Sequence, residues 1–236
     1  MLNCTVKMKM SESEIEKYTI ELLEQQGYQY IYGPDIAPDS ETAERSSFAE
    51  VLLFDRLNNT IARINPEIPA EASDDAVKQI QRLNSPDLIS NNEAFHRLLT
   101  EGVNVTYQKN GQSRGDLVWL IDFAEPENND FIVLNQFTVI ENHVNKRPDI
   151  ILFINGLPML VLELKIPADE NATVHSAYNQ LQTYKQAIPS LFTYNGILVI
   201  SDGLEAKAGS LSADFSRFMS WKSKDGKKKH LHLSDN

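Results

Sequence analysis

The stretch RPDIILFINGLPMLVLELK, residues 147–165, decides the fold of this chain. Two apolar runs lie on either side of the Asn155-Gly156 dipeptide, which is typical of a tight hairpin turn. Charged residues flank these runs: Asp149 precedes the first, and Glu163 and Lys165 end the second. Buried charges are costly unless they are paired or bind a metal ion. The hairpin therefore predicts either a structural ion pair or a functional site.

The facing of these charges depends on the turn. Side chains alternate along a strand, so Glu163 and Lys165 share a face. A three-residue loop at 155–157 puts Asp149 opposite Glu163 on that same face, whereas a two-residue loop or a regular four-residue loop puts them on opposite faces. A shared site therefore predicts an irregular loop or a compensating bulge in this hairpin.

Two carboxylates and a lysine in one place have a coherent chemical use. Carboxylate oxygens suit a hard cation such as Mg²⁺, which polarises a phosphoryl oxygen and lowers the pKa of a bound water. Lys165 can orient that water or stabilise the developing negative charge. Asp149 and Glu163 thus predict a metal site for phosphodiester hydrolysis. The alternative is a structural ion pair of Lys165 with Asp149 or Glu163 at a strand edge.

A second pair of polar residues follows on the next predicted helix, residues 172–188. Gln180 and Tyr184 are four residues apart and share one helix face. Their amide and hydroxyl groups can bind a phosphate oxygen or orient the lysine. The alternative is an ordinary amphipathic helix surface. Because this helix lies between two apolar strands, it predicts a crossover that brings strand 196–201 into the sheet in parallel.

Composition limits the class of protein. The 236 residues carry a net charge of -11, and residues 31–102 alone hold 13 acidic and 6 basic side chains, a net of -7. This argues against a basic DNA-coating protein and leaves only local DNA contacts. Cys4 is the single cysteine, so no disulfide forms within the chain and a cytoplasmic location is expected. No apolar run approaches ~18 residues, so no membrane association is expected.

The order of elements predicts an α/β fold. A helix with capping boxes at Ser11/Glu14 and Ser13/Glu16 precedes a short strand at 28–32. Residues 34–102 have helical periodicity and predict a helical insertion, with an ordinary helical part of one mixed core as the alternative. Strand patterns dominate from residue 102 onward, and they predict strands at 103–108, 115–123, 131–140, 149–154 and 159–165.

The quoted hairpin, followed by NQLQTY at 179–184, resembles the nuclease region of the restriction (R) subunit of type I restriction-modification enzymes, a branch of the PD-(D/E)xK superfamily. The stretches 11–31, 135–149 and 199–222 also resemble this family. The resemblance implies a PD-(D/E)xK restriction-endonuclease-like core, a mixed central sheet flanked by helices. It implies one nuclease domain over residues 1–222, with 34–102 inserted, and a polar Lys-rich tail over 223–236.

The resemblance also assigns roles to residues. Asp149 and Glu163 match the metal-binding acids, and Lys165 matches the catalytic lysine. Gln180 and Tyr184 match a Q-x-x-x-Y motif that supports cleavage and DNA contact. An acid on the first helix often completes such sites, and both Glu12 and Glu16 are candidates here, although a helix-dipole role is the alternative for either. Arg147 lies in a basic stretch with His143 and Lys146 that is either a phosphate contact or a solvated loop.

The implied function is Mg²⁺-dependent cleavage of double-stranded DNA without sequence recognition by this chain. The implied partners are the methyltransferase (modification) and specificity subunits and ATP-driven motor domains C-terminal to this region. No G-x-x-x-x-G-K-[ST] phosphate loop is present, so ATP is expected to bind elsewhere in the full-length subunit. Two alternatives remain: a nuclease of another repair or defence system, and a non-catalytic assembly module that retains the fold.

Overall fold

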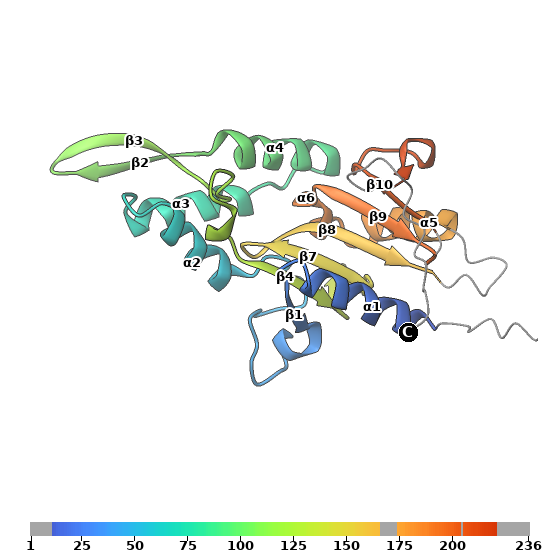
Figure 1. Ribbon diagram of the computed structural model, residues 1–236. Helices are drawn as coiled ribbons and strands as arrows, with labels where there is room; N and C mark the ends of the chain where they lie inside the picture. Colours follow the sequence, from blue (N-terminus) through green and yellow to red (C-terminus); the bar gives the residue numbers. More distant parts are fainter. Residues whose placement is uncertain (1–10, 166–173, 204, 221–236) are drawn as a thin grey trace, which may run out of the picture.

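The centre of the molecule is a seven-stranded mixed sheet with the strand order β1-β4-β7-β8-β9-β10-β11 (Figure 1). The structure is a computed structural model that describes residues 11–165, 174–203 and 205–220. The strands are β1 Gln29–Tyr32, β4 Phe131–Asn135, β7 Ile150–Ile154, β8 Leu157–Leu164, β9 Ile197–Ser201, β10 Ala206–Gly209 and β11 Met219–Ser220. The pairs β1/β4 and β8/β9 are parallel, and the other neighbours are antiparallel. The predicted α/β fold and the parallel crossover are confirmed.

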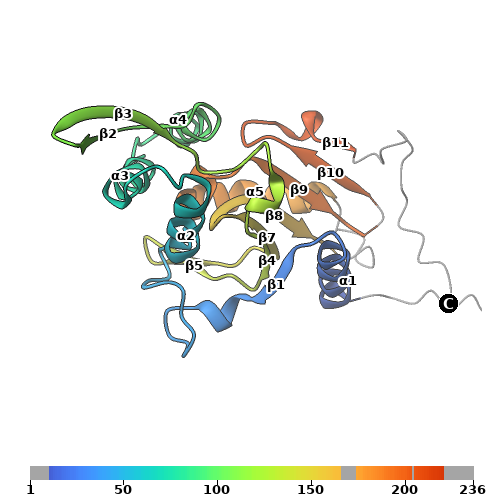
Figure 2. The same ribbon diagram turned by 60° about the vertical axis from the view of Figure 1, so that its left-hand side comes forward.

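Helices cover both faces of this sheet (Figure 2). One face packs against α1 (Glu12–Glu24) in a cluster that includes Ile15, Ile150 and Leu162. The opposite face packs against α5 (Val174–Ala187) and α6 (Pro189–Thr193), where Val161 and Leu181 are fully buried. Because strand residues alternate, every second side chain of β8 faces α5.

The hairpin of β7 and β8 contains the predicted irregularity. Asn155 and Gly156 form a two-residue turn with φ values of 55° and 81°. Ile154 pairs with Leu157, but the register shifts between Leu152 and Phe153, so that the bulge compensates for the short turn. Ile150 pairs with Leu162, which brings Asp149 opposite Glu163.

Asn155 fixes this turn from within the core. Its side chain is fully buried, and its Oδ1 accepts a hydrogen bond from the Asp130 N–H at 2.7 Å. Its Nδ2 donates to the Leu120 carbonyl oxygen at 2.8 Å. The Gly156 carbonyl oxygen accepts a hydrogen bond from the Leu53 N–H at 3.0 Å. The turn is thus attached by hydrogen bonds to three earlier chain segments, at Leu53, Leu120 and Asp130.

Gly156→Ala is expected to destabilise the fold by about 2–4 kcal/mol, because left-handed backbone and a steric clash add together. An added Cβ would clash with the Leu53 carbonyl oxygen. Gly111 is a matched control, since it follows an asparagine in another hairpin turn with φ 76° but has nothing within 4 Å of an added Cβ. Chemical denaturation of both variants measures the difference, and equal losses would contradict the clash.

Three helices lie within the predicted insertion 34–102: α2 (Phe54–Ile64), α3 (Ala70–Gln81) and α4 (Leu88–Glu101). The remainder consists of a 3-10 turn, η1 (Gly33–Ile36), and irregular backbone. The helical periodicity predicted over residues 34–102 was wrong for 46–53, where Val51, Leu52 and Leu53 are buried in irregular backbone. The apolar side chains of the three helices belong to the same continuous core as the sheet.

Two predicted strands do not join the central sheet. β2 (Val103–Lys109) and β3 (Gln112–Val118) form a separate hairpin that projects beside α3 (Figure 1). The expected long strand at 131–140 is also divided, since Gln136 adopts a φ of 56° and ends β4. Its second part, β5 (Val139–Glu141), pairs with β6 (Val144–Lys146) in another two-stranded sheet. Sequence alternation predicts strands but not the sheet that each one joins.

The capping box at Ser11 and Glu14 is formed, whereas Glu16 turns inward from α1 instead of capping it. Short 3-10 turns complete the elements, η2 (Pro126–Asn128) and η3 (Phe215–Arg217). Within the described residues no helix is both long enough and apolar enough to cross a membrane. The predicted tail, residues 223–236, lies outside the described residues.

Candidate active site

Glu163 and Lys165 meet at the end of β8. The Glu163 side chain is fully buried, and its Oε1 accepts a hydrogen bond from Lys165 Nζ at 2.7 Å. Its other oxygen, Oε2, is buried and has no hydrogen-bond partner among the described residues. A buried carboxylate oxygen without a donor is costly, which is expected at a site built to receive another ligand.

Asp149 lies beside this pair. Its Oδ2 accepts a hydrogen bond from the Leu164 N–H at 2.7 Å, across the hairpin. Burial raises the pKa of Asp149 to about 6, although the Leu164 N–H and the charge of Lys165 oppose the shift. The hairpin therefore brings Asp149, Glu163 and Lys165 together, as the shared-site prediction requires.

The two acids influence each other strongly. Burial, followed by the negative charge of Asp149, raises the pKa of Glu163 to about 8 despite the hydrogen bond from Lys165. For Lys165, burial lowers the pKa, but the hydrogen bond and charge of Glu163 outweigh it, so the pKa is raised. Without a further cation the pocket thus favours a protonated Glu163 and a charged lysine near neutral pH.

Both candidate acids of α1 approach the site, in different ways. Glu12 Oε1 lies 3.6 Å from Lys165 Nζ at a half-exposed position. Glu16 is buried, and its Oε1 accepts hydrogen bonds from Asn135 Nδ2 at 2.5 Å and from Gln136 Nε2 at 3.4 Å. Glu12 therefore extends the charge network of Lys165, whereas Glu16 is held by the end of β4.

Asn135 and Gln136 were not predicted from the sequence as site residues. Asn135 Oδ1 also accepts a hydrogen bond from the Tyr30 hydroxyl at 2.9 Å, so it links β1, β4 and α1. The available signal was the Asn-Gln pair that interrupts an apolar strand at 131–140. Polar residues at that position resemble an ordinary turn, and only the folded sheet places them beside Glu16.

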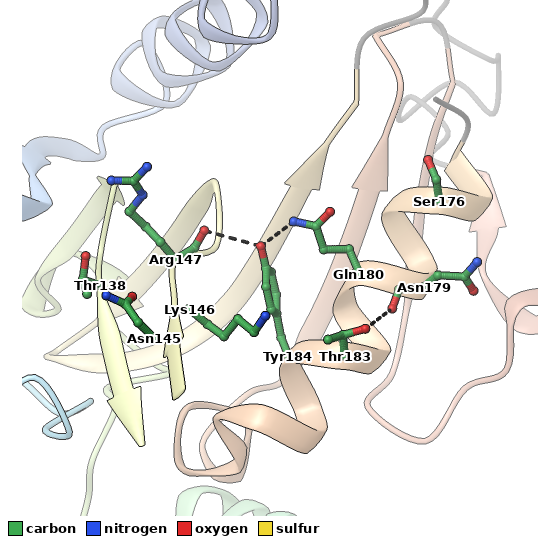
Figure 3. A pocket seen from close by; sticks show the side chains of 9 residues that line it. All are labelled: Thr138, Asn145, Lys146, Arg147, Ser176, Asn179, Gln180, Thr183 and Tyr184. Carbon is green, nitrogen blue, oxygen red and sulfur yellow. Dashed lines mark hydrogen bonds between the residues drawn. The ribbon is translucent and has the colours of Figure 1, made fainter. Parts of the chain in front are cut away.

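The two predicted helix residues, Gln180 and Tyr184, lie on α5 next to the acids. Gln180 Nε2 donates a hydrogen bond to the Tyr184 hydroxyl oxygen at 2.5 Å, and that hydroxyl donates to the Arg147 carbonyl oxygen at 3.4 Å (Figure 3). Burial raises the pKa of Tyr184 above its usual range, with a further contribution from the charge of Glu163. Tyr184 therefore stays a neutral hydrogen-bond donor beside the acids.

The donor set fits a hard divalent cation. Two carboxylates with raised pKa values and one unpartnered buried oxygen would all be relieved by an ion such as Mg²⁺. Among the described residues no three His, Cys, Asp or Glu side chains are arranged around one point as ligands. A cation at Asp149 and Glu163 would thus complete its shell with water and substrate oxygens, which Mg²⁺ commonly does.

A mixed sheet that presents an aspartate and a Glu-x-Lys pair on one hairpin, with a Gln-x-x-x-Tyr helix beside it, has the features of a PD-(D/E)xK nuclease-like domain. Residues 9–217 match the family model described as the type I restriction enzyme R protein N terminus. The chain belongs to this family.

Relatives extend the similarity. The chain is 40% identical over 225 residues to the type I restriction enzyme HindI endonuclease subunit of Haemophilus influenzae, which covers 95% of this chain and 21% of that protein. It is 37% identical over 210 residues to the putative type I restriction enzyme MjaIXP endonuclease subunit of Methanocaldococcus jannaschii, covering 88% and 20%. The chain thus spans about a fifth of the length of these two relatives.

Proposed function

We propose that this chain is the nuclease region of a type I restriction enzyme R subunit and hydrolyses phosphodiester bonds of double-stranded DNA with Mg²⁺. The observation that carries the proposal is the Asp149–Glu163–Lys165 cluster on one hairpin, in which Glu163 is fully buried. Names of relatives support the role, since they are called endonuclease subunits of type I restriction enzymes.

Each residue has a distinct task in this proposal. Asp149 and Glu163 hold the cation, and a bound Mg²⁺ supplies charge neutralisation and a more acidic water. Lys165, kept charged by Glu163, stabilises negative charge on the attacked phosphate. Gln180 and Tyr184 donate hydrogen bonds to phosphate oxygens of the DNA backbone. The two acids of α1 add negative charge to the cluster: Glu12 lies 3.6 Å from Lys165, and the charge of Glu16 acts on Asp149.

The wider setting is part of the same proposal. Backbone contacts are sequence-blind, so recognition of a DNA sequence is assigned to a specificity subunit that acts with the methyltransferase subunit. ATP-driven translocation is assigned to motor domains elsewhere in a longer R subunit, because the relatives are about five times as long as their matched region. DNA as substrate and a single cysteine, Cys4, support action in the cytoplasm.

Plasmid nicking tests the nuclease role directly. The purified chain is expected to nick supercoiled plasmid in Mg²⁺ and not in EDTA, and Asp149→Asn is expected to lower the rate by about 10²-fold or more, because it removes a charged cation ligand. Asp74→Asn, at an exposed position on α3, is the matched control and should nick like wild type. Nicking that survives in Asp149→Asn would contradict the assignment of the metal site.

A further inference from the structure

A polar groove lies next to the acid cluster, between α5 and the strand β6. Its volume is about 680 Å³. Nine side chains line it: Thr138, Asn145, Lys146, Arg147, Ser176, Asn179, Gln180, Thr183 and Tyr184 (Figure 3). Two of these are cationic and none is a carboxylate. Such a lining is unusual on a chain with a net charge of -11.

The two cations of the groove are not committed to ion pairs. Within the described ranges neither Lys146 nor Arg147 has a carboxylate at salt-bridge distance. By contrast, Arg56 is held by Glu44 at 2.6 Å and by Asp130 at 3.0 Å. An unpaired cation in a groove without carboxylates focuses a positive potential, which attracts an anion.

The groove adjoins the acid cluster at Tyr184. The Tyr184 hydroxyl contacts Gln180 and the Arg147 backbone, both of which line the groove, and Arg147 lies two residues before Asp149 in the chain. If one phosphate of a polymer is bound at the acids, the adjacent phosphate of the same strand therefore reaches the groove. Figure 3 shows that the Lys146 and Arg147 side chains point in different directions from the strand.

We infer that this groove binds the phosphate backbone of DNA next to the bond that is cut, with Lys146 as the counterion and Asn179 as an amide donor. The inference rests on the proposed function and extends it to residues outside the acid cluster and the Gln-x-x-x-Tyr motif. Lys146 is half-buried at the end of β6, and Asn179 is exposed on α5, one residue before Gln180. The shared ligand chemistry is a phosphate oxyanion, and the chosen source is duplex DNA.

Binding is measured by fluorescence anisotropy with a labelled duplex and Ca²⁺ in place of Mg²⁺, over a series of salt concentrations. Lys146→Ala is expected to weaken binding at low salt and to reduce the slope of log K against log salt by about one, since one phosphate contact is lost. Lys109→Ala, at the exposed tip of the β2–β3 hairpin, is the matched control and should leave both quantities unchanged.

An isosteric variant guards against misfolding of Lys146→Ala. Asn179→Asp places a carboxylate in the groove without changing its size and is expected to weaken binding at least about 3-fold by charge repulsion. Asn58→Asp makes the same change at an exposed position on α2 and should have no effect. Lys146→Arg, which retains the charge, should retain affinity.

Three results would overturn the inference: no duplex binding by the wild-type chain at low salt, wild-type affinity and slope in Lys146→Ala, or Lys146-dependent binding of inorganic phosphate with unchanged DNA affinity. The last result would assign the groove to a small phosphate ligand. The proposed function is tested by a separate measurement, which compares DNA cleavage by the wild-type chain and by Lys165→Ala. Lys146-dependent binding without any cleavage would retain the groove and reject the nuclease.

Discussion

Lys165→Ala is expected to lower the rate of Mg²⁺-dependent plasmid nicking by about 10²- to 10³-fold, the usual loss when one stabilising donor is removed from a developing oxyanion. The lysine is oriented for this role by the 2.7 Å hydrogen bond to Glu163 and by Glu12 at 3.6 Å. Its side chain is only 17% exposed, so water replaces the lost charge poorly.

The fold offers a close control for this prediction. Lys207 is 19% exposed on β10, and its Nζ lies 3.5 Å from Glu205, the residue two positions earlier. The two-residue spacing and the exposure of the lysine match those of Lys165, but Glu205 is 41% exposed whereas Glu163 is fully buried. Lys207 also lies over the Phe215 ring. Lys207→Ala should nick like wild type. Equal loss in both variants would indicate damage to the sheet rather than to the chemistry.

Glu163→Gln is expected to abolish nicking and, in the absence of metal, to stabilise the fold on the order of 2–4 kcal/mol at pH 8. The variant removes a buried charge that is repelled by Asp149 and retains an oxygen for the Lys165 hydrogen bond. Glu12 remains as a counterion for the lysine. Replacing an unfavourable buried charge by a neutral group of the same shape is often stabilising.

The pH dependence gives this prediction a sign. The pKa of Glu163 is 4.5 as its ordinary value and about 8 in the fold, so between these values the folded state retains a proton that the unfolded state has lost. Wild-type stability should therefore fall as pH rises from about 4.5 to about 8, and the advantage of Glu163→Gln should grow over the same window. Near pH 4 the two proteins should unfold alike.

Thermal and denaturant unfolding at pH 4, 6 and 8 measure the effect, with Glu205→Gln as the control at a paired but 41% exposed position. Added Mg²⁺ should raise the wild-type unfolding temperature most at pH 8, where the acids ionise most readily, and should leave Glu163→Gln unmoved. A variant that is less stable than wild type at every pH would favour a purely structural ion pair between Glu163 and Lys165.

The sequence predicted which charged residues the β7–β8 hairpin brings together more fully than it predicted the surrounding fold. The D…ExK spacing, with the Asn-Gly turn, led to a bulge that the β7–β8 register now contains. This succeeded because alternation in a strand is a strict geometric rule. The sheet to which residues 103–118 belong could not be read in the same way, because period-two alternation is identical in a central strand and in an isolated hairpin.

The contribution of α1 was equally difficult to predict. Glu12 and Glu16 both matched the position of a further acid, and both also matched an acidic helix start. The distinction arises from Asn135 and Gln136, more than a hundred residues away, which bind Glu16 where β4 ends. The capping box at Ser11 sets the start of the helix and therefore the direction in which Glu16 points. No local pattern contains that long-range pairing.

The two ends of the β7–β8 hairpin have different roles. At one end the turn at Gly156 is held by Leu53, immediately before α2, and by the buried Asn155. At the other end Asp149 and Glu163 leave oxygens available for a ligand. Substitutions in the helical segments next to the turn can therefore alter one end of the hairpin. The reacting groups at the other end keep their spacing. The strands β7 and β8 act as a rigid spacer between the turn and the acid cluster.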